Sequence, residues 1–148
     1  MDLRWTILIA EDSEDDRELL ALGLTGAKLP FLFEFVGDGC EAMDYLQGTG
    51  KYADRTCYPL PWLLITDIKM PRVDGLELLS WVRTEASWQK MPAIVYSSSV
   101  RDGDRNAAMG LGAAAYVVKD VVFPPLELVQ AIKDCAVLHP GLPGVRAC

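Results

Sequence analysis

Short apolar runs alternate with amphipathic segments along the whole chain. Five runs are almost continuously apolar, which is typical of strands buried on both faces of a parallel sheet. The segments between them carry apolar residues at helical spacing, most weakly over Asp102–Leu111. This order predicts an α/β fold in which a doubly wound, five-stranded parallel sheet has helices on both faces. The predicted strands are Thr6–Ala10, Phe31–Val36, Leu63–Thr66, Pro92–Tyr96 and Ala114–Val118.

Capping and turn residues set the expected ends of the helices. Ser13 is followed by acids, as at a helix N-terminus, and Gly26 is expected to stop the leucine-rich helix that Ser13 begins. Asp74 begins a third helix, and the proline pair at 124–125 opens the last one, because proline is tolerated in a first turn. The polar segment 48–61 is longer than the usual connection and is expected to be a surface excursion available for recognition.

Composition limits the classes of function. The 148 residues predict one domain over 1–138, followed by an irregular tail over 139–148 that is rich in proline and glycine. The net charge is −7 and the basic residues are scattered, which disfavours direct nucleic-acid binding. No apolar run approaches the roughly 20 residues of a membrane span, so we expect a cytoplasmic protein without a membrane partner. The four cysteines form no CxxC pair, which disfavours a zinc site.

Residues that can carry chemistry follow the predicted strands. They are the pair Glu11-Asp12, then Asp67, Ser97 and Lys119. Because the carboxyl ends of parallel strands share one edge of the sheet, we expect these side chains to meet there. Three neighbouring carboxylates repel one another unless a cation lies among them, and hard oxygen ligands with room for water suit Mg²⁺. A lysine and a hydroxyl beside them suit a phosphoryl group, for which Asp67 could be the nucleophile.

Each residue taken alone has a simpler interpretation. Glu14, Asp15 and Asp16 are interpreted as acids of the first helical turn, where they complement the helix dipole, and not as ligands. Ser97 alone would be a turn residue and Lys119 alone a solvated charge. Their joint occurrence at successive strand ends is what favours a site.

The same residues resemble the signature of bacterial two-component response regulator receiver domains. Asp67 lies in the motif Asp-x-x-Met-Pro-x-x-Asp-Gly, an acidic pair follows the first strand, and a hydroxyl and a lysine follow Asp67 by 30 and 52 residues. The resemblance extends from Trp5 to about Leu138 and implies the flavodoxin-like strand order 2-1-3-4-5. The polar insert ending in Tyr-Pro-Leu-Pro and the chain length make it similar to the stand-alone regulators of phytochrome-like kinases.

The resemblance implies an acceptor and a metal site. Asp67 would accept a phosphoryl group from a phosphohistidine of a sensor histidine kinase, and the similarity to the stand-alone regulators implies a phytochrome-like kinase. The ligands of Mg²⁺ would be Glu11, Asp12, Asp67 and the backbone carbonyl of Lys69.

The resemblance also implies a switch. Ser97 would move to bond the phosphate, Tyr116 would swing inward with it, and Lys119 would pair with phosphate oxygens. Phosphorylation would then change a surface formed by the fourth helix, fifth strand and fifth helix, which a partner or a second protomer in a homodimer would read.

Two positions depart from related patterns. Asp120 stands where the family has a proline after Lys119, with a cis bond between the two. A non-proline cis bond costs roughly 2.5–4 kcal/mol, so we expect a trans bond here and a repositioned lysine or neighbouring loop.

Lys69 stands where haloacid-dehalogenase-like phosphatases need a second acid. The sequence therefore predicts a non-enzymatic phosphoacceptor switch with at most slow autodephosphorylation. The alternatives are a pseudo-receiver that only binds partners and a Mg²⁺-dependent phosphatase.

Overall fold

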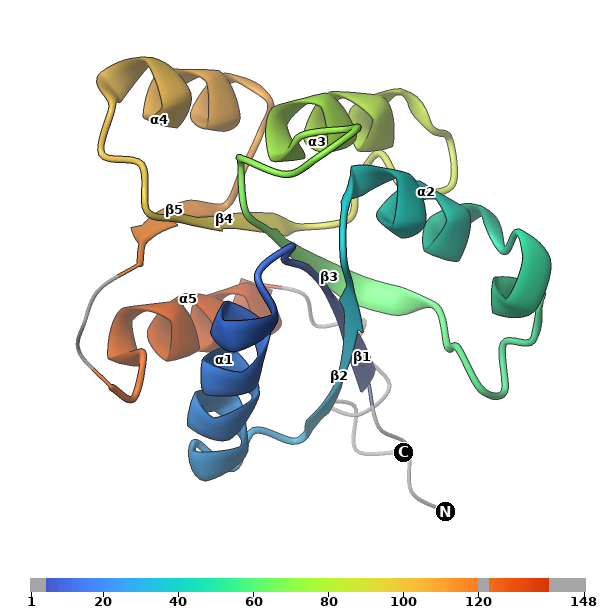
Figure 1. Cartoon of the computed structure of the whole chain (residues 1–148), viewed down its shortest axis with the longest axis horizontal. Coiled ribbons are helices and arrows are strands. Elements are labelled where there is room, and N and C mark those ends of the chain that lie inside the picture. The colour runs from blue at the N-terminus through green and yellow to red at the C-terminus, as the bar shows by residue number, and fades with distance from the viewer. Residues whose placement is uncertain (1–4, 120–122, 139–148) are drawn as a thin grey trace.

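A computed structural model describes residues 5–119 and 123–138 of the chain. Within these residues, five strands form one parallel sheet in the order β2-β1-β3-β4-β5, so the predicted fold class and strand order are confirmed (Figure 1). The strands are β1 (Trp5–Ala10), β2 (Phe31–Val36), β3 (Pro61–Thr66), β4 (Ala93–Ser97) and β5 (Ala115–Val118).

Helices cover both faces of the sheet, as predicted. In Figure 1, α1 and α5 lie on one face, while α2, α3 and α4 lie on the other. A short 3-10 helix, η1, follows α2. These elements are α1 (Glu14–Gly26), α2 (Gly39–Gln47), η1 (Gly50–Ala53), α3 (Gly75–Thr84), α4 (Asp102–Gly110) and α5 (Leu126–Leu138).

Side chains of the central strands alternate between two apolar cores. Leu8, Leu64 and Val95 lie in the core beneath α2, α3 and α4. Ile7 and Ile65 lie in the core that α1 and α5 cover. Because neighbouring residues of a strand point to opposite faces, a strand buried on both faces needs apolar residues at successive positions. This requirement explains the continuous apolar runs in the sequence.

Helix α1 begins where the sequence predicts, but its leucines do not all face the core. Ser13 is the N-cap and its side chain accepts a first-turn backbone N–H. Leu20 and Leu24 are buried, whereas Leu19 and Leu22 are 56% and 65% exposed. Helix α1 therefore presents large apolar side chains to solvent.

The segment 48–61 is more firmly packed than the predicted surface excursion. Tyr52 in η1 is buried, and its ring centroid lies 4.9 Å from that of Tyr45 in α2. The Tyr52 hydroxyl donates a hydrogen bond to Glu41 at 2.8 Å, and the Tyr45 hydroxyl donates one to the carbonyl of Pro59 at 2.8 Å. Aromatic side chains thus hold this segment against α2. The spacing of apolar residues does not predict this contact, because the segment is mostly polar.

Residues 123–125, which precede α5, pack against α1. The bond after Lys119 and the C-terminal tail, on which the sequence makes predictions, lie outside the described residues. A cis peptide bond precedes Pro124. A Cβ atom added at Gly23 of α1 would lie 2.5 Å from Cδ of Pro125, so the glycine makes room for this contact. Among the described residues, no helix combines the length and the apolar character that crossing a bilayer requires.

Candidate functional site

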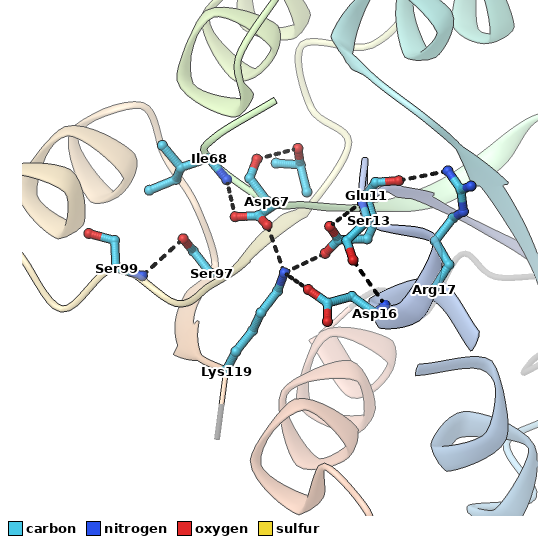
Figure 2. A network of polar contacts seen from close by, with 10 residues as sticks. Glu11, Ser13, Asp16, Arg17, Asp67, Ile68, Ser97, Ser99 and Lys119 are labelled. Atoms are coloured by element: carbon cyan, nitrogen blue, oxygen red, sulfur yellow. Dashed lines mark hydrogen bonds and ion pairs between the residues drawn. The ribbon is translucent and has the colours of Figure 1, made fainter. Parts of the chain in front are cut away.

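The predicted site residues meet at the carboxyl edge of the sheet, beside the N-terminus of α1 (Figure 2). Backbone hydrogen bonds continue just past the strand ends and fix these residues there. Glu11 N donates to Val36 O at 3.0 Å, Asp67 N to Ala10 O at 3.1 Å, and Lys119 N to Ser97 O at 2.8 Å. Residues far apart in the sequence are therefore held together by the sheet itself.

The ammonium group of Lys119 lies among three carboxylates. It donates to Glu11 Oε1, to Asp67 Oδ2 at 2.7 Å and to Asp16 Oδ2 at 2.9 Å (Figure 2). The side chains of Lys119, Glu11 and Asp67 are only 15%, 3% and 10% exposed, whereas that of Asp16 is 43% exposed. Three of the four charges in this group are thus largely removed from water.

Burial and hydrogen bonding shift the ionisation of this group in opposing ways. Burial raises the pKa of Glu11 above its ordinary value of 4.5, and the hydrogen bonds from Lys119 and the Ser13 N–H offset this only in part. Burial alone would lower the pKa of Lys119, but hydrogen bonds to Asp67, Glu11 and Asp16 raise it above its ordinary 10.5. The lysine therefore stays charged at any physiological pH.

Three of the acids are close enough together to hold a metal ion. Carboxylate oxygens of Glu11, Asp12 and Asp67 lie within 4.8 Å of one another, and Asp12 is exposed. Hard oxygen donors of this kind fit a divalent cation that keeps part of its water shell. The surplus of negative charge around one lysine fits a cation as well. The backbone carbonyl of Lys69, the fourth predicted ligand, stays a prediction.

Asp67 itself is held by two donors. Its Oδ1 accepts from the N–H of Ile68 at 2.7 Å, and its Oδ2 accepts from Lys119. The following loop closes on Asp67, because Gly75 N donates to Ile68 O at 2.7 Å. A Cβ atom at Gly75 would lie 1.8 Å from the backbone oxygen of Asp67, so only glycine fits there. This close approach explains the glycine of the sequence motif.

The hydroxyl residues are arranged around Ser99 and not around Asp67. The hydroxyl of Ser97, only 1% exposed, accepts from Ser99 N at 3.2 Å. Tyr116 is buried and donates to Ser99 O at 2.9 Å, with the Arg105 guanidinium 4.8 Å from its ring centroid. Within the described residues, no hydrogen bond joins Ser97 to Asp67. In the described residues, the side chains of the two predicted switch residues therefore both bond to Ser99, and neither bonds to Glu11, Asp16 or Asp67.

Asp16 is the site residue that the sequence interpretation missed. It lies in the first turn of α1, as expected, but its carboxylate also contacts Lys119. The usual back-bond from such an acid to the N-cap N–H is not made, because Glu11 Oε2 accepts from Ser13 N at 3.1 Å instead. The spacing of the acids in the sequence gives no signal for this contact.

The sequence profile of the response regulator receiver domain matches residues 7–133. The chain therefore belongs to the response regulator receiver domain family. Its function is that of a response regulator, which accepts a phosphoryl group and signals through its surface. Neither the phosphatase nor the pseudo-receiver alternative is needed to account for the family match.

Individual relatives show which members of the family this chain is similar to. The response regulator Rcp1 of Synechocystis sp. is 29% identical over 129 residues, which is 86% of each chain. The structure of the bacteriophytochrome response regulator AtBRR matches with a TM-score of 0.77 and 35% identity over 90% of this chain and 94% of that one. The structure of the Mn²⁺-bound form of Rcp1 matches with a TM-score of 0.72 and 25% identity over 96% and 97%. The predicted similarity to regulators of phytochrome systems is thus confirmed.

Proposed function

We propose that Asp67 is the phosphoacceptor and that a phosphohistidine of a sensor histidine kinase, of the kind that phytochromes use, is the donor. The observation that carries this assignment is the way Asp67 is held, with one oxygen on the Ile68 N–H and the other on Lys119. A carboxylate oxygen fixed in this way can form the new bond to phosphorus while the bond between phosphorus and the imidazole nitrogen breaks. The electron pair of the broken bond stays on the imidazole.

The surrounding residues supply the charge that the transfer needs. Mg²⁺ held by Glu11, Asp12, Asp67 and the carbonyl of Lys69 would neutralise phosphoryl oxygens as it does in other phosphoryl transfers. The Mn²⁺-bound form of Rcp1 supports a divalent ion at such a site, and the acid set here supports Mg²⁺. Lys119 donates to a phosphoryl oxygen once the group is on Asp67. These residues act on one covalent group, so the protein needs no more chemistry than slow autodephosphorylation.

The exposed apolar side chains of α1 support a protein partner beside this site. Leu19 and Leu22 lie on α1, whose first turn bears Asp16, and Phe123 is 56% exposed. A ring atom of Phe123 would lie 3.4 Å from a Cβ atom at Gly23, which places Phe123 against the same helix. Exposed apolar residues of this kind mark interaction surfaces. A kinase docked here would lie on the helix whose first turn contacts Lys119, the lysine that is bonded to Asp67. The homodimer through α4, β5 and α5, the cytoplasmic location and the lack of nucleic-acid binding stay predictions.

Intact-mass measurement tests the acceptor directly. The protein is incubated with Mg²⁺ and acetyl phosphate and then weighed. We expect one phosphoryl adduct on the native chain, none on Asp67→Asn, and an undiminished adduct on Asp44→Asn, which removes an exposed carboxylate of α2. A native chain that gains no phosphoryl group, or an Asp67→Asn variant that still does, would overturn the assignment.

A further inference from the structure

Lys119 uses all of its hydrogen-bonding capacity before any phosphoryl group arrives. An ammonium group has three N–H donors and no acceptor. In the structure it has three carboxylate acceptors, on Glu11, Asp67 and Asp16. To donate to a phosphoryl oxygen, Lys119 must weaken one of these bonds.

The three bonds differ in what breaking them costs. The Glu11 side chain is 3% exposed, so water cannot replace Lys119 at its carboxylate, which would keep only the Ser13 N–H and the proposed Mg²⁺ as partners. Asp67 carries the phosphoryl group and stays next to the lysine. The Asp16 side chain is 43% exposed, so water can replace Lys119 at its carboxylate. The bond to Asp16 is therefore the one that gives way.

The local structure leaves Asp16 available for this contact. Its backbone N–H is fixed by the hydroxyl of Ser13 at 3.2 Å, which sets its position on α1. At α3, by contrast, Glu77 in the equivalent third position accepts from the N–H of the N-cap residue Asp74, at 3.3 Å. At α1 that role falls to Glu11, and the carboxylate of Asp16 is directed to Lys119 (Figure 2).

We propose that Asp16 is a positioning residue that competes with the phosphoryl group for Lys119 and so slows phosphoryl uptake by Asp67. The inference rests on the proposed function, because it assumes that Asp67 is the acceptor. Asp16 does not touch the reacting atoms. It acts through Lys119, whose ammonium group it holds in the resting arrangement.

The variant Asp16→Asn tests this role, with Asp15→Asn as the matched control. Both variants remove one negative charge from the first turn of α1, but Asp15 is exposed and has no contact with Lys119. We expect Asp16→Asn to take up phosphoryl from acetyl phosphate at saturating Mg²⁺ about two- to fivefold faster than Asp15→Asn, the range of a partly exposed ion pair. Asp16→Glu should restore the slower rate.

A second readout separates positioning from a purely structural role. Hydrogen exchange of the Lys119 ammonium group, followed by ¹⁵N NMR, should be faster in Asp16→Asn and unchanged in Asp15→Asn. Equal uptake rates and equal exchange in the two variants would overturn the proposal. If the native chain takes up no phosphoryl group at all, the acceptor assignment fails first, so the two failures are distinguishable.

Discussion

The two sides of Asp67 are bonded in different ways. On the α1 side, Glu11 and Asp16 share the ammonium group of Lys119 with Asp67, and every contact involves a full charge. On the α4 side, Ser97 and Tyr116 bond to Ser99 and leave Asp67 alone. The comparison shows that one lysine is already shared among three carboxylates in the resting protein, whereas the Ser97 side chain bonds to Ser99 and makes no hydrogen bond to Asp67. Under the proposed function, the α1 side would hold the charges that the transfer needs, and the α4 side would respond to the transfer by exchanging its hydrogen bonds.

The largest effect should come from removing the shared cation. Lys119→Met leaves Glu11 and Asp67 buried and unpaired, and we expect a loss of about 3–5 kcal/mol in the free energy of unfolding at neutral pH without metal. Mg²⁺ should recover most of this loss, because it binds among the same carboxylates in the folded state only. Urea denaturation with and without Mg²⁺ measures both values.

The pH dependence of this variant has a defined sign. The pKa of Glu11 is raised by burial in the folded protein, so the folded state binds this proton more tightly than the unfolded state does. Stability therefore falls as the pH rises from 4.5 through the folded pKa, and loss of Lys119 should extend that fall to higher pH. The exposed Lys90→Met is the control. A Lys119→Met variant that responds to neither Mg²⁺ nor acidification would contradict this account of the α1 side.

A smaller effect should come from the α4 side. Tyr116→Phe removes the hydrogen bond to Ser99 O, and we expect a loss of about 1 kcal/mol in the free energy of unfolding. This loss should be the same with and without Mg²⁺, because the hydroxyl bonds to no charged group. Tyr45→Phe, which likewise removes a hydrogen bond from a tyrosine hydroxyl to a backbone carbonyl, that of Pro59, is the matched control. A Mg²⁺-dependent loss in Tyr116→Phe would show that the two sides are already coupled at rest.

The smallest effect on the fold should come from Lys69, whose side chain is exposed two residues after Asp67. Its ammonium group can lie over the phosphoryl group and screen it from attacking water. Lys69→Ala should shorten the lifetime of the phosphorylated form about two- to fivefold, as expected for an exposed charge. The free energy of unfolding should change by less than about 0.5 kcal/mol. The lifetime of the phosphorylated form is measured by following the intact mass over time, with Lys90→Ala as the control. An unchanged lifetime in Lys69→Ala would show that Lys69 has no part in the mechanism.

Backbone-determined features of the site were predictable from the sequence. The apolar runs locate the strand ends, and parallel strands bring their ends to one edge, so Glu11, Asp67 and Lys119 could be placed together before the structure was known. The position of a capping serine also follows from residue type, as Ser13 shows. These features depend on local pattern and on topology, both of which the sequence carries.

Side-chain directions were less predictable. Asp16 meets a lysine 103 residues away, and nothing in the first turn of a helix shows whether its acid will bend toward such a cation. Leu19 and Leu22 fit the helical pattern as well as the buried leucines do, yet they face solvent. Tyr52 lies in a polar stretch and is buried by contacts with other tyrosines. Each of these outcomes is decided by which distant surface the side chain meets.

The close fit of Gly75 against Asp67 has a mechanical consequence. The amide of Gly75 is bonded to Ile68 O, and the space beside the backbone oxygen of Asp67 is already filled. The start of α3 is thus packed tightly against the backbone of Asp67, the proposed acceptor. Movement of the Asp67 backbone toward α3 is resisted, because densely packed atoms resist compression. If Asp67 accepts a phosphoryl group as proposed, we expect the response to lie at the ends of β4 and β5, where Ser97 and Tyr116 have hydrogen bonds to exchange.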